Sequence, residues 1–109
     1  MNNLLFSKSI TELSRLIKNK DIQVLELVRA ALQTIENEND KLNAFITVNP
    51  DAEAIARQMD QQIALGHDLG LLHGIPIGVK DMIDTHDMKT TKGSKIYENF
   101  VPKKDAEVV

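Results

Sequence analysis

The chain has 109 residues and a net charge of −3, with 13 basic and 16 acidic side chains and 42% hydrophobic residues. This length allows one domain at most, and the hydrophobic share is too high for a disordered chain. The charge balance gives no broad basic surface for nucleic acid or an acidic membrane, and no apolar run approaches the ~20 residues that cross a bilayer. The absence of cysteine excludes disulfide scaffolds, thiolate zinc sites and a cysteine nucleophile, and it fits a reducing cytoplasm.

The first two predicted elements are amphipathic helices. Ser9 and Glu12 have the spacing of a capping box at the start of the first helix, whose apolar residues then recur on one face. The second helix begins within residues 21–23, and its apolar residues recur at three- and four-residue steps. The polar run 36–40 is expected to stop this helix and form a turn.

Residues 42–48 change to the alternating pattern that is typical of a β-strand. Asn49 and Pro50 then predict the cap and the first residue of a third helix. Gly66 suits the left-handed position that follows a helix end.

Beyond Gly66 the sequence is rich in glycine and polar turn residues, with one short apolar segment, 75–81, which we interpret as a second strand despite its proline. The end of the sequence is expected to begin a helix at an Asp105 cap. Two strands are a poor core for three amphipathic helices. The sequence therefore predicts an α/β fold in which residues 1–109 are a piece of a larger domain, with a large exposed apolar face if they fold alone.

Lys80 is the first candidate functional residue. On a strand its side chain shares a face with Pro76 and Gly78, and the missing side chain of Gly78 lets another segment approach closely. A lysine removed from water loses stability in its charged form, and only a neutral amine can accept a proton from a hydroxyl nucleophile. The alternative is an ordinary lysine at a strand end, with its amine in water and loosely paired with Asp81.

A cluster of acidic and histidine residues is the second candidate, because carboxylates and imidazoles can bind a divalent metal. Its spacing matches neither a calcium loop nor the His-Glu-x-x-His zinc pattern, so solvated loop acids are expected and no metal site is predicted. The cluster consists of Asp81, Asp84, His86 and Asp87, with His73 nearby.

Residues 89–95 combine hydroxyl side chains, a glycine and three lysines. They could line a substrate pocket or hold a phosphate, yet they lack the Gly-x-x-x-x-Gly-Lys-Ser/Thr spacing of a phosphate loop. A polar turn is the simpler interpretation, and Ser94 is no better as a nucleophile than any loop serine.

Residues 72–81, Leu-His-Gly-Ile-Pro-Ile-Gly-Val-Lys-Asp, resemble the lysine segment of the amidase signature family. Upstream, residues 41–48 are similar to that family's first strand, so the resemblance spans nearly the whole chain. Downstream, the similarity continues through residues 83–84, 88–94, 98–102 and 105–109.

This resemblance implies the N-terminal fragment, helices plus first strands, of a large mixed sheet flanked by helices, and it makes residues 1–109 part of a single amidase signature domain. It implies hydrolysis of a carboxamide C–N bond by a serine nucleophile, a second serine on a cis peptide, and a lysine. Lys80 matches the lysine. It would take a proton from the nucleophile through the bridging serine and later help protonate the leaving amine.

Both serines of the family lie in a segment rich in Gly-Ser-Ser-Gly-Gly-Ser that these 109 residues do not contain, so the chain alone is expected to be inactive. Two alternatives stay open. One is the related A subunit of glutamyl-tRNA(Gln) amidotransferases, which transfers glutamine-derived ammonia and works with a partner subunit that handles the tRNA. The other is a non-catalytic truncated remnant.

For ligands and partners, the resemblance implies a small-molecule amide substrate and no cofactor or metal. It implies no direct contact with nucleic acid or a membrane, a need for the rest of the amidase domain, and partner subunits if the protein is an amidotransferase. A cytoplasmic location is expected.

Overall fold

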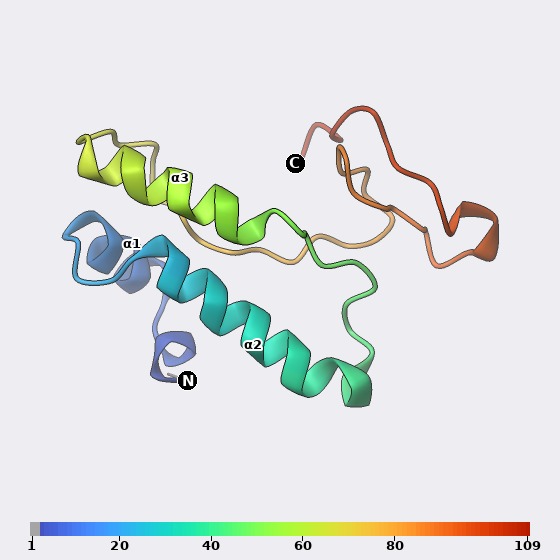
Figure 1. Ribbon diagram of the computed structural model, residues 1–109, viewed down its shortest axis with the longest axis horizontal. Helices are drawn as coiled ribbons and strands as arrows, with labels where there is room; N and C mark the ends of the chain where they lie inside the picture. The colour runs from blue at the N-terminus through green and yellow to red at the C-terminus, as the bar shows by residue number, and fades with distance from the viewer. Residues whose placement is uncertain (1–2) are drawn as a thin grey trace. The chain divides into compact units, whose positions relative to one another are not determined.

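The computed structural model describes residues 3–109. In this part of the chain the regular elements are helices, as Figure 1 shows. Three are α-helices, α1 (Ile10–Lys18), α2 (Val24–Leu42) and α3 (Ala52–Ala64), and two are short 3-10 helices, η1 (Asn3–Ser7) and η2 (Lys95–Tyr97).

The chain divides into two compact units. The helical unit comprises the described residues up to Asn43 together with Pro50–Pro76, and it holds η1 and all three α-helices. The loop unit comprises Ala44–Asn49 and Ile77–Val109, and apart from η2 it consists of turns and irregular segments.

The predicted α/β fold is wrong, because the described residues contain no β-strand. Residues 43–49 and 75–80 have no regular secondary structure, and no backbone hydrogen bond between these two described segments joins them into a ladder. Alternating side chains indicate an extended segment, whereas a strand also requires a neighbour with which its N–H and C=O groups pair. Pro76 in addition has no N–H to donate.

The start of α1 confirms the predicted capping box. The Ser9 hydroxyl accepts a hydrogen bond from the Glu12 N–H at 3.2 Å, and the Glu12 carboxylate accepts one from the Ser9 N–H at 2.7 Å. The Ser9 N–H also lowers the pKa of Glu12, because it stabilises the charged carboxylate. Leu13 and Ile17 lie on the buried face of this helix, as its periodicity predicts.

The second helix is longer than predicted. α2 continues through the polar run 36–40 and ends only at Asn43, whose left-handed backbone (φ +51°) stops it. Most side chains of the run are exposed, and its two glutamates are good helix formers. The loss of the apolar stripe therefore marks where α2 leaves the core, while its backbone hydrogen bonds continue.

The third helix begins two residues later than predicted. Pro50 lies in a turn, and Asp51 rather than Asn49 is the residue that precedes α3. The predicted role of Gly66 is confirmed: it has φ +80°, and the N–H groups of Gly66 and His67 donate to carbonyls of the last helical turn. This is the Schellman arrangement, in which glycine is favoured because it has no Cβ.

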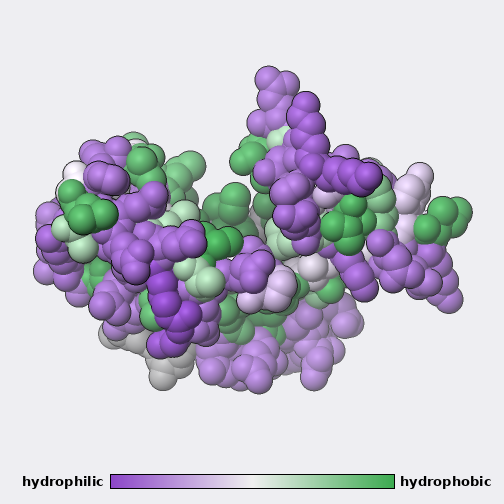
Figure 2. All heavy atoms as spheres, turned by 45° about the horizontal axis from the view of Figure 1, so that its top comes forward, coloured by the Kyte–Doolittle hydropathy of each residue, from purple (hydrophilic) through white to green (hydrophobic). Residues whose placement is uncertain are grey.

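The core of the helical unit forms between the apolar faces of its helices, and α2 and α3 lie side by side and antiparallel (Figure 1). Many large hydrophobic side chains stay exposed in both units, and Figure 2 shows some of them in green among hydrophilic residues. None of the described helices combines the length and the hydropathy that a membrane span requires. The buried core residues are Leu5, Leu13, Ile17, Val24, Leu27, Ala30 and Ala56.

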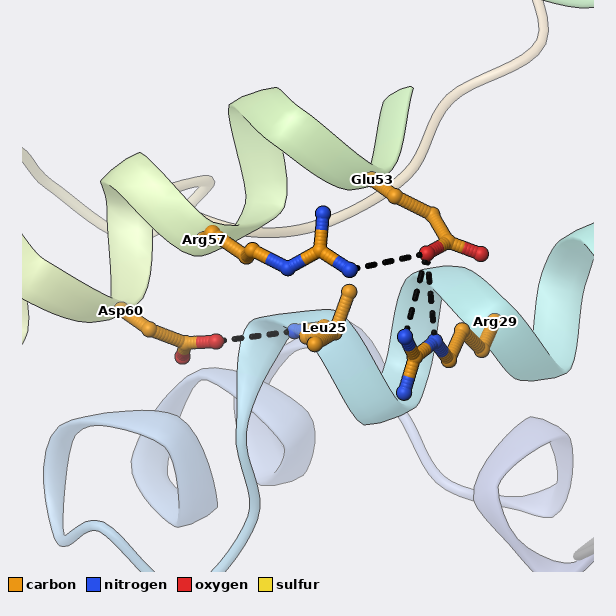
Figure 3. A network of polar contacts seen from close by, with 5 residues as sticks. All are labelled: Leu25, Arg29, Glu53, Arg57 and Asp60. Atoms are coloured by element: carbon orange, nitrogen blue, oxygen red, sulfur yellow. Dashed lines mark hydrogen bonds and ion pairs between the residues drawn. The ribbon is translucent and has the colours of Figure 1, made fainter. Parts of the chain in front are cut away.

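A carboxylate of α3 joins the first turn of α2. Gln23 precedes α2 but makes no side-chain cap, and Asp60 of α3 instead accepts from the N–H groups of Val24 at 2.7 Å and Leu25 at 3.0 Å. Figure 3 shows Asp60 beside Leu25. These N–H groups have no partner within the helix, so the carboxylate satisfies them and meets the positive end of the helix dipole.

An ion-pair network also links the two helices. The Glu53 carboxylate of α3 lies 3.2 Å from the Arg29 guanidinium of α2 and 3.4 Å from that of Arg57, as Figure 3 shows. All three side chains are well exposed, so water screens the network and it contributes little to stability.

The helix predicted at Asp105 is absent. Residues 101–109 form bends and turns. The Asp105 carboxylate accepts from the His86 N–H at 2.6 Å, and the Ala106 N–H donates to the Asp84 carbonyl at 2.9 Å. The Asp105 carboxylate thus binds the backbone N–H of His86 in an earlier loop instead of capping a new helix.

Candidate active site around Lys80

The beginning of the lysine segment is packed into the helical unit. His73 is buried, and its Nε2 lies 3.2 Å from the Met59 carbonyl of α3. Gly74 has φ +82° and lies against Val24, so closely that an added Cβ would come within 2.5 Å of the valine Cγ2. Ile75 packs against the core. The His-Gly-Ile part of the motif therefore has a structural role.

Lys80 belongs to the loop unit, where its carbonyl accepts from the Ile83 N–H at 2.9 Å. Its side chain is exposed, so the expected removal from water is not seen in this chain. Among the described residues the ammonium group makes no hydrogen bond or ion pair, so the loose pairing with Asp81 is not seen either. The catalytic role of Lys80 stays a prediction.

The close approach predicted at Gly78 is made by an aromatic ring. A Cβ added to Gly78 would lie 3.6 Å from the Cε1 and Cζ atoms of Phe45. That distance is ordinary van der Waals contact, so a Cβ at position 78 would fit beside the ring without a clash.

Asp81 is bound to the segment that follows the motif. The Thr91 N–H donates to Asp81 Oδ1 at 2.9 Å, the Thr91 hydroxyl donates to Oδ2, and the Lys92 N–H donates to the Asp81 carbonyl at 3.0 Å. The Thr91 hydroxyl, followed by its N–H, holds the pKa of the Asp81 carboxyl below its usual range despite partial burial.

Two threonines fix the loop beyond Asp81. Thr90 is buried, and its Oγ1 accepts from the Thr85 N–H at 3.3 Å and lies 3.1 Å from the Thr85 Oγ1. The Thr90 N–H donates to the Phe100 carbonyl at 2.9 Å. The sequence does not identify Thr90 and Thr91 individually. The only signal for them is that both lie in residues 88–94, which resemble the amidase signature family.

The hydroxyl- and lysine-rich segment 89–95 is engaged within the loop unit. The Lys92 ammonium lies 3.3 Å from Asp84 Oδ1 and 5.9 Å and 5.8 Å from the ring centres of Tyr97 and Phe100. The Ser94 hydroxyl accepts from the Ile96 N–H and caps η2. These contacts leave Lys92 and Ser94 as structural residues in this chain.

The acidic and histidine side chains do not converge. Asp84 pairs with Lys92, His86 Nδ1 lies 3.0 Å from Asp87 Oδ2, and His73 lies in the helical unit. In residues 3–109 no three histidine or carboxylate side chains gather as a metal site would require.

The helical unit carries a pocket of about 690 Å³ that does not include the lysine segment. Its walls come from η1, from the turn between α1 and α2, and from α2. The lining residues are Leu5, Lys20, Asp21, Ile22, Gln23, Leu25, Glu26, Arg29, Ala30 and Gln33.

Comparison with known proteins gives many similar relatives, among them three that are each described as the A subunit of a glutamyl-tRNA(Gln) amidotransferase. That of Bdellovibrio bacteriovorus is 48% identical over 93% of this chain and 21% of its own length. Those of Bacillus licheniformis and Geobacillus kaustophilus are 43% and 41% identical over 96% of this chain and 22% of their own lengths.

The chain therefore spans about a fifth of the length of the curated relatives it matches. The sequence model of the Amidase family matches residues 26–109, which is most of the chain and includes the whole of the lysine segment. The resemblance noted from the lysine segment is thereby confirmed: this chain belongs to the amidase signature family.

Proposed function

We propose that this chain is part of the A subunit of a glutamyl-tRNA(Gln) amidotransferase and that Lys80 is the general base of its amide-hydrolysing site. The observation that carries the proposal is the identity of 41–48% to proteins of that name across 93–96% of the chain. Membership of the amidase signature family supports the coarser part, hydrolysis of a carboxamide C–N bond.

In the proposed reaction a serine hydroxyl attacks the carboxamide carbon of glutamine. The Lys80 amine accepts the serine proton through a second serine, the new C–O bond forms, and the C–N bond breaks as the proton passes to the leaving ammonia. Water then hydrolyses the acyl-enzyme to glutamate. Both serines would lie in the same domain but outside these 109 residues, so the chain by itself supplies the base alone.

The surroundings of Lys80 support this role. Its ammonium group makes no hydrogen bond or ion pair within the described chain, so it remains available to a hydroxyl. Ile77 and Met82, which flank it in sequence, are 71% and 61% exposed. Exposed apolar side chains of this size favour burial against another surface, and the rest of the domain would provide it. Such burial would favour the neutral amine that a base requires.

The proposal extends to partners and location. Partner subunits would handle the tRNA and receive the ammonia, and the protein would work in the cytoplasm, where tRNA is aminoacylated. A single-chain amidase that hydrolyses a free amide is the second candidate, and the family match is the observation that favours it.

One experiment separates the two candidates. Ammonia release from glutamine is measured with the full-length protein alone and with its partner subunits and glutamyl-tRNA. Release that rises strongly when both are added supports the amidotransferase. Equal hydrolysis of a simple amide such as propionamide, with or without partners, would instead identify a single-chain amidase.

A further inference from the structure

The backbone around Lys80 is held on its C-terminal side by three neighbouring contacts. The Lys80 carbonyl accepts from the Ile83 N–H at 2.9 Å, and the Asp81 carbonyl accepts from the Lys92 N–H at 3.0 Å. The Asp81 side chain binds Thr91. Because both carbonyls and the adjacent side chain are engaged, the backbone that follows Lys80 is restrained.

The Asp81 carboxylate, next to Lys80, is also hydrogen-bonded. An unoccupied carboxylate at Asp81 could pair with the neighbouring ammonium and favour the charged form, which cannot accept a proton. Thr91 holds this carboxylate instead, because its N–H donates to Oδ1 at 2.9 Å and its hydroxyl donates to Oδ2. In the described chain the Lys80 amine accordingly forms no pair with Asp81.

We propose that Asp81 and Thr91 are positioning residues for Lys80. Thr91 binds both oxygens of the Asp81 carboxylate, which fixes the backbone that carries the lysine and keeps the carboxylate away from its amine. This inference rests on the proposed role of Lys80 as a base. Neither residue is proposed to contact the substrate, so each would act through the lysine.

The test compares Thr91→Val, which removes the hydroxyl and keeps the shape, with Thr91→Ser, which keeps the hydroxyl. Both are made in the full-length protein with its partner subunits, and ammonia release from glutamine is measured. A base displaced by about 1 Å costs roughly 100-fold in rate, so Thr91→Val is expected to lower kcat about 10- to 100-fold and to change KM by less than about twofold. Thr91→Ser is expected to restore most of kcat.

Thr90→Val is the matched control. It removes a neighbouring hydroxyl that binds Thr85 and does not touch Asp81. It is expected to lower the melting temperature while kcat of the folded enzyme stays within about twofold of the wild type. A purely structural role for Thr91 would give Thr91→Val the same pattern, with lower stability and unchanged kcat, and that result would overturn the inference. An equal loss of kcat in Thr91→Val and Thr91→Ser would also overturn it, since the hydroxyl would not be the cause.

A second readout keeps this inference separate from the proposed function. If the wild-type enzyme hydrolyses a plain amide instead of glutamine, the proposed function fails and the same variants are compared on that amide. If it hydrolyses no amide, the role of Lys80 as a base fails, and amide hydrogen exchange at Ile83 and Lys92 tests by itself whether Thr91 holds the backbone next to Lys80. Faster exchange at both positions in Thr91→Val but not in Thr91→Ser supports positioning, and unchanged exchange overturns it.

Discussion

Gly74 lies where the lysine segment meets the first turn of α2, and its environment allows no side chain. Gly74→Ala would combine a positive φ of +82° with a Cβ only 2.5 Å from Val24. Gly66→Ala is the matched control, because its φ of +80° is similar and nothing lies within 4 Å. Gly74→Ala is therefore expected to destabilise the helical unit by about 1–3 kcal/mol more than Gly66→Ala. Because both positions have a similar φ, this difference measures the cost of overpacking against Val24.

Hydrogen exchange of the α2 amides in the full-length protein measures this difference as a free energy of opening. Equal effects of the two substitutions would show that the contact between Gly74 and Val24 does not constrain the fold.

Asp81 gives the loop unit a pH dependence of known sign. The Thr91 hydroxyl holds the pKa of the Asp81 carboxyl below its usual range, so the stabilisation is present above the unfolded value of about 4 and is lost as the pH falls through the lowered pKa. A carboxyl NMR titration is expected to place Asp81 below the usual range in the wild type and closer to it in Thr91→Val. The same midpoint in both proteins would contradict the assigned cause.

The sequence predicts Lys80 as a candidate from the residue pattern around it and from its family motif, but it does not predict how the neighbours of Lys80 are held. The contact between Asp81 and Thr91 joins residues ten positions apart, and it depends on a loop path that no local periodicity encodes. At Gly78 the sequence predicts a contact but not the residue that makes it. Its missing side chain indicates a close approach, but nothing in the sequence identifies Phe45 as the group that fills it.

At the scale of elements, α2 depends on a cap supplied by another helix. Removing a helix cap costs about 0.5–2 kcal/mol, so Asp60→Ala is expected to destabilise the first turn of α2 by that amount. Asp60→Asn should cost less, because an amide oxygen can still accept one of the two bonds from Val24 and Leu25.

Hydrogen exchange rates of the Val24 and Leu25 amides measure this effect. The control is Gln61→Ala, which changes the next residue of α3, where the side chain is exposed. An Asp60→Ala protein with unchanged exchange at both amides would refute the capping role.

The elements that the sequence predicts well are those with local signals. The capping box of Ser9 and Glu12 and the helix stop at Gly66 act within a few residues, and both are confirmed. The end of α2 is predicted wrongly because the polar run 36–40 indicates exposure and not the end of a helix. The strands are predicted wrongly because alternation carries no information about a pairing partner.

At the scale of the whole molecule, the described residues leave many large hydrophobic side chains exposed. Large hydrophobic side chains are exposed in both units, among them Leu72 at 64%, Ile77 at 71% and Ile96 at 88%. Such surface favours association in water. The 109 residues expressed alone are expected to bind a hydrophobic dye and to self-associate, whereas the full-length protein does neither at the same concentration. If light scattering shows that the 109 residues are a monomer, and this monomer binds no dye, the prediction is contradicted.

Ammonia release from glutamine, measured with the full-length protein and the proposed partner subunits, tests the proposed role of Lys80 as a base. General acid–base catalysis contributes about 100- to 10,000-fold, so Lys80→Ala is expected to lower kcat by at least about 100-fold with little change in melting temperature. Lys89→Ala, which removes another exposed lysine of the loop unit, should leave kcat unchanged. A Lys80→Ala enzyme that keeps the wild-type kcat would contradict the account.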